Sequence, residues 1–255
     1  MNTAIQVNAS LAMVFPGQGS QSVGMLSDIA ESSPAVDETF ARASEVLGYD
    51  LWQLVQQGPA EVLNQTGNTQ PAMLAAGVAV WRAWQARDGA QPVVMAGHSL
   101  GEYTALVCAG ALQFGDAIAL VAERGRCMQS AVPEGVGAMA AILGLDDAAV
   151  ANVCEAAAEG EVVSPVNYNS PGQVVIAGHA AAVERATALA REAGAKRAVR
   201  LPVSVPSHCS LMRNAASDFA ARLAQVDISS PRIPVIQNVD AMAHADPETI
   251  RDNLG

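Results

Sequence analysis

Residues 92–101 are Pro92-Val93-Val94-Met95-Ala96-Gly97-His98-Ser99-Leu100-Gly101. The apolar run predicts a buried strand, and a helix is predicted to start at the Gly-x-Ser-x-Gly motif and continue to Cys108 or Ala109. A serine between a strand and a helix is typical of a nucleophile elbow, in which the glycines permit a tight turn. We therefore expect Ser99 to be a strained, exposed nucleophile, with the Leu100 N–H directed at a developing oxyanion. The alternative is a Gly-Ser turn that carries no chemistry.

Strands and helices alternate on both sides of this motif. A strand is predicted over Leu11–Phe15 and helices over 34–47 and 61–64, followed by a helix to about Arg87 with Pro71 in its first turn. Asp116 is the expected N-cap of a further helix, 117–131. Helix returns over 206–226 and strand over 233–238. This alternation predicts an α/β fold in which a parallel sheet is covered on both faces.

The element order changes after Pro133-Glu134-Gly135. The segment that follows predicts, in order, a strand over 136–145, a helix capped by Asp146 or Asp147, two hairpin strands over 162–169 and 173–178, a helix over 179–193 and a strand over 198–201. This β-α-β-β-α-β order is the ferredoxin-like unit. We expect a small domain, 134–203, inserted into a large domain made of 1–133 and 204–255.

Composition excludes several classes of protein. The 255 residues are 51% hydrophobic and carry a net charge of −11, which argues against a nucleic-acid binder and against electrostatic binding to anionic membranes. The four cysteines are scattered, so we expect neither a zinc site nor disulfides, and reduced thiols favour the cytoplasm. No signal peptide and no membrane helix are expected.

A nucleophilic serine needs a base, and the chain has four histidines. His98 adjoins Ser99, but successive side chains diverge at a sharp turn, so we interpret it as structural. His179 opens a predicted helix and His244 lies in a polar stretch. His208 lies where a strand-like run meets a helix start, which is where such sheets place functional loops, so its position in the sequence favours it as the base.

Arg124 is the informative cation. It shares one face of its predicted helix with Leu120 and Met128, and a cation on an apolar stripe is costly unless it is paired. Its partner is either a protein carboxylate or a substrate carboxylate, which a guanidinium binds with two hydrogen bonds. Arg126 can meet Glu123 and is expected to be structural.

A glycine-rich loop, Phe15-Pro16-Gly17-Gln18-Gly19-Ser20-Gln21, follows the first predicted strand. It lacks the lysine of a phosphate loop and the spacing of a dinucleotide fingerprint, so nucleotide binding is not expected. Two interpretations of Gln18 remain open: its side chain donates to an oxyanion, or it braces the loop.

Together these residues resemble the malonyl-CoA:acyl-carrier-protein transacylases of type II fatty acid synthesis and the related acyltransferase domains of polyketide synthases. The resemblance covers almost the whole chain from Leu11. The matching segments are Val14–Gln21, Gly97–Tyr103, Glu123–Gly125, Gly137–Ile142, Asn167–Gln173 and Val205–His208.

The resemblance implies an α/β-hydrolase-like large domain with a ferredoxin-like insertion. It also implies roles: Ser99 as nucleophile, His208 as general base and acid, Gln18 and the Leu100 amide as oxyanion hole, and Arg124 as the ligand of the malonyl carboxylate. The implied reaction moves malonyl from CoA to the pantetheine thiol of acyl carrier protein through a serine ester. Malonyl-CoA is then a substrate, no cofactor or metal is bound, and the chain is expected to act as a monomer.

Carrier proteins are typically acidic, so a local basic surface is expected to bind them. Lys196, Arg197 and Arg200 cluster at the end of the predicted small domain, and we interpret them either as part of a docking surface or as an ordinary solvated patch.

Two other functions remain open: a serine hydrolase or thioesterase that uses water as acceptor, and an inactive carrier-binding fragment. Relatives continue past the helix near Pro247 with an Asn-Pro-Val-x-Trp-like segment, from which a backbone carbonyl orients the histidine. The present chain lacks that segment, and Asp240 and Asp246 are only positional candidates to replace it. We therefore expect lower turnover from this chain than from one extended by a relative's C-terminal segment, and equal rates would contradict that expectation.

Overall fold

The computed structural model describes residues 7–133, 135–201, 203 and 205–255. The chain forms two compact units, one of residues up to 125 together with 219–255, and the other of residues 126–218. The boundary residues 134 and 204 expected from the sequence lie outside the described residues. The second unit is one continuous stretch of chain between two stretches of the first.

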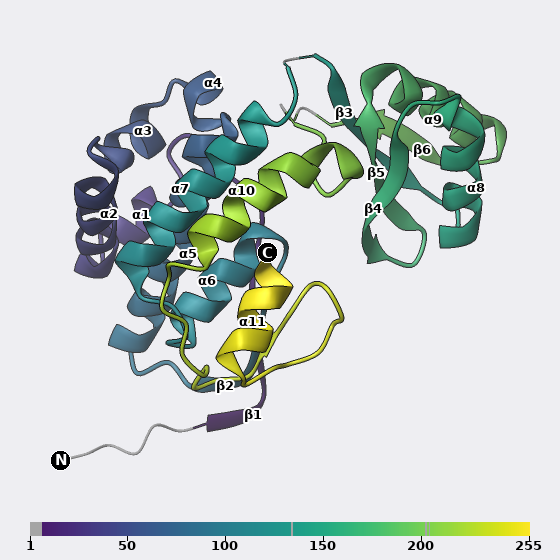
Figure 1. Ribbon diagram of the computed structural model, residues 1–255. Coiled ribbons are helices and arrows are strands. Elements are labelled where there is room, and N and C mark those ends of the chain that lie inside the picture. Colours follow the sequence, from purple (N-terminus) through teal and green to yellow (C-terminus); the bar gives the residue numbers. More distant parts are fainter. Residues whose placement is uncertain (1–6, 134, 202, 204) are drawn as a thin grey trace. The chain divides into compact units, whose positions relative to one another are not determined.

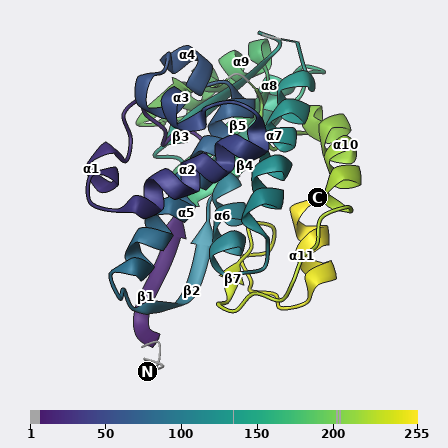
Figure 2. The same cartoon turned by 90° about the vertical axis from the view of Figure 1, so that its left-hand side faces the viewer.

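The first unit contains a parallel sheet of three strands in the order β1-β2-β7, namely β1 (Val7–Phe15), β2 (Gln91–Gly97) and β7 (Val235–Ile236). Figure 2 shows β1 and β2 running side by side. Phe15 is the partner of Gly97 in the register, so the loop after β1 meets the Gly-x-Ser-x-Gly motif after β2. Parallel strands place their carboxyl-end loops at one edge, which is where α/β sheets carry their sites.

Helices supply the remaining elements of the first unit. They are α1 (Ser27–Ala30), α2 (Pro34–Leu47), α3 (Leu51–Gln57), α4 (Ala60–Leu63), α5 (Thr66–Ala86), α6 (Leu100–Cys108) and α11 (Pro247–Leu254), with most of α7 (Phe114–Ser130) and the end of α10 (Arg213–Leu223). The core is mainly aliphatic, as the low aromatic content requires, and Phe40 is the one aromatic among its largest fully buried side chains. No helix in the described ranges is both long and apolar enough to span a membrane.

Three helix starts differ from the sequence prediction. α10 begins at Arg213, after a 3-10 helix over Ser210–Met212, and not at residue 206. α5 begins at Thr66, so Pro71 lies inside the helix instead of in its first turn. The Thr69 hydroxyl donates to the Leu63 carbonyl, and its backbone N–H bonds to Gln65, so polar side chains and turn bonds start this helix before the proline. α7 begins at Phe114, and Asp116 is in its first turn, where a carboxylate still complements the helix dipole.

The second unit contains an antiparallel sheet in the order β4-β5-β3-β6. Its elements, in chain order, are β3 (Gly137–Leu143), α8 (Asp147–Ala158), β4 (Val163–Ser170), β5 (Gln173–His179), α9 (Ala180–Glu192), β6 (Arg197–Arg200) and the 3-10 helix η1 (Ser210–Met212). α8 and α9 pack on the sheet over one apolar cluster (Figure 1). The ferredoxin-like prediction is confirmed, and Asp146 caps α8 by accepting the Ala149 N–H at 2.7 Å.

Candidate active site

Ser99 lies between the end of β2 and the first residue of α6. Its backbone has φ 51° and ψ −104°, a conformation that L-residues adopt only under strain, at roughly 1–3 kcal/mol. Leu100 opens α6, so its N–H lies at the positive end of the helix. The strand, the strained serine and the helix have the geometry that the motif predicts for a nucleophile elbow, and the role of Ser99 as nucleophile stays a prediction.

The two glycines of the motif allow the end of β2, the start of α6 and the end of β1 to lie in contact. A Cβ atom on Gly97 would collide with the carbonyl group of Gly101, and one on Gly101 would collide with the Phe15 carbonyl at the end of β1. The turn therefore closes only if both positions lack a side chain. His98 is held beside it, since its N–H donates to the Phe15 carbonyl at 3.0 Å and its ring packs against Gly17.

Arg124 lies beside the serine. Its Nη2 is 3.4 Å from Ser99 Oγ, its Nη1 donates to Gln70 Oε1 at 3.0 Å, and its guanidinium carbon is 5.4 Å from the centre of the Tyr103 ring. Burial raises the pKa of Tyr103 to about 12, which keeps the phenol neutral. All these partners are neutral, so the cation lies beside Ser99 without a close ion pair among the described residues.

α5 contacts both Arg124 and the loop after β1. Gln18 Nε2 donates to Thr66 Oγ1 at 3.2 Å, and Gln70, the partner of Arg124, follows one turn later on α5. Gly125 lets α7 approach this turn, because a Cβ atom there would lie 2.6 Å from the Thr66 carbonyl oxygen. Gln18 thus braces its loop, and its role in an oxyanion hole stays a prediction.

Two polar residues at the elbow, Glu102 and Asn238, are not assigned a role by the sequence analysis. Glu102 is only 4% exposed, and Asn238, in the loop after β7, bonds both to Glu102 and to the backbone of the elbow. Burial raises the pKa of Glu102, while hydrogen bonds from Asn238 and Gln237 and the charge of Arg124 oppose that shift. The available signal was that Glu102 is the only charged residue of α6.

His208 lies in the second unit, on the loop before η1. Its φ of 65° is in the left-handed region, so this candidate base, like Ser99, is held in an uncommon conformation. The side chain is exposed, and the following Cys209 is buried with its thiol bonded to the Pro206 carbonyl at 3.1 Å. The structure describes each unit by itself, so the pairing of His208 with Ser99 stays a prediction.

The remaining candidates have local partners. His179 is the N-cap residue of α9, and its Nδ1 accepts the Val162 N–H at 2.9 Å. His244 Nε2 lies 2.6 Å from Asp240 Oδ2, and this hydrogen bond lowers the pKa of Asp240. Asp246 caps α11 by accepting from the Thr249 N–H and hydroxyl. Both aspartates therefore have short-range structural roles.

Lys196, Arg197 and Arg200 are all exposed. β6 is the edge strand of its sheet, and alternation along a strand puts Arg197 and Arg200 on opposite faces of it. The three charges thus gather along an edge rather than on a flat face.

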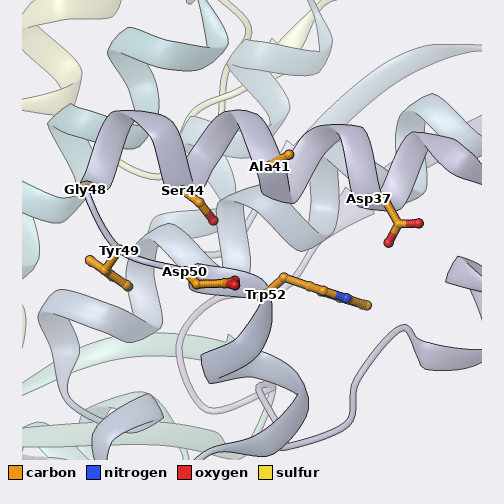
Figure 3. Close-up of a pocket in the computed structure, with 7 residues that line it drawn as sticks. All are labelled: Asp37, Ala41, Ser44, Gly48, Tyr49, Asp50 and Trp52. Atoms are coloured by element: carbon orange, nitrogen blue, oxygen red, sulfur yellow. The ribbon is translucent and has the colours of Figure 1, made fainter.

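A shallow cavity of about 480 Å³ lies elsewhere in the first unit, between α2 and the start of α3 (Figure 3). Its lining residues are Asp37, Ala41, Ser44, Gly48, Tyr49, Asp50 and Trp52. Asp50 caps α3 through the Gln53 N–H, and the Tyr49 hydroxyl donates to Asn68. None of the predicted site residues lines this cavity, and within the described ranges no group of three or more His, Cys, Asp or Glu side chains is placed to hold a metal ion.

Comparison with known proteins gives consistent matches over nearly the whole chain. The family model described as "Acyl transferase domain" matches residues 12–252. The chain is 63% identical over 243 residues to the malonyl CoA-acyl carrier protein transacylase of Salmonella typhimurium, covering 95% of this chain and 79% of that protein. It is 46% identical over 247 residues to the transacylase of the same name from Bacillus subtilis, with 96% and 78% covered.

Solved structures of similar sequence match the fold of this chain. The crystal structure of an acyl carrier protein S-malonyltransferase from Vibrio cholerae matches with a TM-score of 0.92 and 65% identity, over 95% of this chain and 79% of that one. A structure of a malonyl-transacylase in complex with a type II polyketide synthase acyl carrier protein matches with a TM-score of 0.94 and 59% identity, over 95% and 79%.

Proposed function

The chain belongs to the acyl transferase domain family, and from this premise we propose that it moves a malonyl group from malonyl-CoA to the pantetheine thiol of an acyl carrier protein, for fatty acid biosynthesis. The observation that carries the proposal is the position of Arg124, whose guanidinium lies 3.4 Å from Ser99 Oγ with neutral partners. A cation at a nucleophile fits an acyl group that carries its own carboxylate.

The first half-reaction forms the serine ester. His208 takes the Ser99 hydroxyl proton while Oγ attacks the thioester carbonyl of malonyl-CoA, and the carbonyl oxygen becomes an oxyanion. The Leu100 N–H and Gln18 stabilise that charge. The C–S bond then breaks, the CoA sulfur takes the proton from His208, and malonyl remains on Ser99 as an ester.

The second half-reaction is the reverse of the first with another thiol. His208 takes the proton of the pantetheine thiol, the sulfur attacks the ester carbonyl, and the C–O bond to Ser99 breaks as the proton returns to Oγ. The products are malonyl-carrier protein and free enzyme, so no cofactor and no metal enter the cycle. We expect the chain to act as a monomer, and its four free cysteines support a cytoplasmic setting.

The fate of the malonyl group tests this proposal against a thioesterase. With malonyl-CoA alone, we expect one burst of CoA, stoichiometric with the chain, and then little further release, because Arg124 holds the malonyl carboxylate and the ester lacks its thiol acceptor. Adding carrier protein with its pantetheine arm should restart CoA release and yield malonyl-carrier protein, detected by mass spectrometry. Continuous release of free malonate without carrier would identify a hydrolase, and no burst at all an inactive binding fragment.

We propose further that Lys196, Arg197 and Arg200 form part of the carrier docking surface, because their exposed charges along the β6 edge suit an acidic partner. Lys196→Glu with Arg197→Glu should raise the KM for carrier protein by about 10-fold, since rim charges act mainly on encounter, and should leave the KM for malonyl-CoA unchanged.

Arg42→Glu is the matched control for this prediction, because Arg42 is exposed on α2 and pairs only with Glu45 three residues on. Steady-state kinetics with each substrate varied in turn give both constants. An equal rise in both KM values, or the same rise in the Arg42 variant, would contradict a docking role.

A further inference from the structure

The side chain of Asn238 bonds to the elbow backbone on both sides of the nucleophile. Its Oδ1 accepts the Ser99 N–H at 2.9 Å, and its Nδ2 donates to the Gly97 carbonyl at 2.8 Å. These two groups flank the turn at which the backbone takes its strained conformation. A single amide therefore ties the residue before the turn to the nucleophile itself.

Glu102 fixes which way that amide points. Its carboxylate accepts from the backbone N–H of Asn238 at 2.9 Å, from Asn238 Nδ2, and from Gln237 Nε2 at 3.1 Å. An ionised carboxylate is an acceptor only, so it requires the NH₂ end of the amide and directs the amide oxygen to the Ser99 N–H. The opposite orientation would place two acceptors against each other and two donors against each other.

The contacts continue away from the turn. Gln237 is 1% exposed, and its Oε1 accepts from Asn253 Nδ2 at 2.9 Å, on α11. The hydrogen bonds thus form a continuous path. It runs from α11 to Gln237 after β7, then to Glu102 on α6, and through Asn238 to the backbone N–H of Ser99. Glu102 and Gln237 are buried, whereas Asn238 is exposed, so the Asn238 amide is fixed by its direct contact with the buried Glu102 carboxylate, and Asn253 lies at the far end of the network.

We propose that Asn238, oriented by Glu102, is a positioning residue that holds Ser99 in the attacking conformation; this inference rests on the proposed function of Ser99 as the malonyl acceptor. The positive φ of Ser99 costs free energy, and a turn freed from the amide is able to relax toward an ordinary conformation. Relaxation would move Oγ from its place beside Arg124 and turn the Leu100 N–H away from the oxyanion. Misplacement of about 1 Å can lower a rate by about 100-fold.

The test is the single-turnover rate of malonyl ester formation, measured with malonyl-CoA for the parent, Asn238→Ala and Glu102→Gln. We expect a fall of about 100-fold for Asn238→Ala and about 10-fold or more for Glu102→Gln, because a glutamine there presents a donor to the amide donors around it. The malonyl-CoA concentration at half-maximal rate should change by less than about 3-fold, since Arg124 stays in place.

Asn253→Ala is the matched control, because it removes one hydrogen bond of the same network and leaves every contact of Ser99, Gly97 and Glu102 intact. Thermal melting of all variants separates folding from positioning. Rates near that of the parent in both elbow variants would overturn the inference, as would an Asn253→Ala variant that loses equally much rate. A parent that forms no ester would overturn the proposed function itself, and the inference with it.

Discussion

Ser99→Ala is expected to abolish malonyl transfer, with a fall in turnover of about 10,000-fold or more. The reason is chemical: without Oγ no acyl-enzyme forms, and the ping-pong cycle has no first step. The measurement is the rate of malonyl-carrier protein formation from malonyl-CoA. Ser27→Ala serves as the control, because the Ser27 hydroxyl bonds only locally to the Gly24 carbonyl and should keep the parent's rate.

His208→Ala extends this prediction to the base. If Ser99 and His208 act as a unit, each single variant should lose nearly as much as the double variant, since removing either partner disables the same step. Losses that multiply in the double variant would show that the two residues act independently. Substantial turnover in Ser99→Ala would exclude the serine-ester mechanism.

Arg124→Ala is expected to lower kcat/KM for malonyl-CoA by about 10- to 100-fold while changing that for acetyl-CoA much less. Hydrogen bonds to a charged group contribute roughly 1.5–3 kcal/mol, and each 1.4 kcal/mol is a factor of ten. Acetyl-CoA lacks the carboxylate, so it loses no such bond. The experiment is a competition between the two thioesters, which gives the ratio of their kcat/KM values directly.

Arg124→Lys is the informative companion variant. Lysine keeps the charge but lacks the planar pair of donors, so we expect it to keep only part of the preference for malonyl-CoA. If Arg124→Ala lowered kcat/KM equally for both thioesters, the guanidinium would act only through its contacts with Ser99 or Gln70. The proposal that it binds the substrate carboxylate would then fail.

The elbow was predictable from sequence because its determinants are local. An apolar run, two glycines around a serine and a helix start define the turn within ten residues, and the collisions at Gly97 and Gly101 explain why both glycines are needed. The ferredoxin-like order was equally visible, since its strands and helices are short, regular and separated by clear turns. Arg124 was found because a charge on an apolar helix face must have a partner.

Other parts of the site depend on contacts distant in sequence. Asn238 meets Ser99 across 139 residues, and no pattern around it distinguishes it from an ordinary loop asparagine. The start of α5 differs from the prediction because Pro71 is typical of a first helical turn. In the structure the helix begins at Thr66, and the Thr69 hydroxyl donates to the Gln65 carbonyl one turn before the proline. Side-chain networks of this kind become visible only when the fold brings the segments together.

The most direct test of the central claim is peptide mass spectrometry of the parent chain after brief exposure to malonyl-CoA without carrier protein, quenched in acid. The account predicts one added malonyl group, on the peptide that contains Ser99, and its loss when carrier protein is supplied before the quench. A malonyl group on any other residue, or none on Ser99 while CoA is still released, would contradict it.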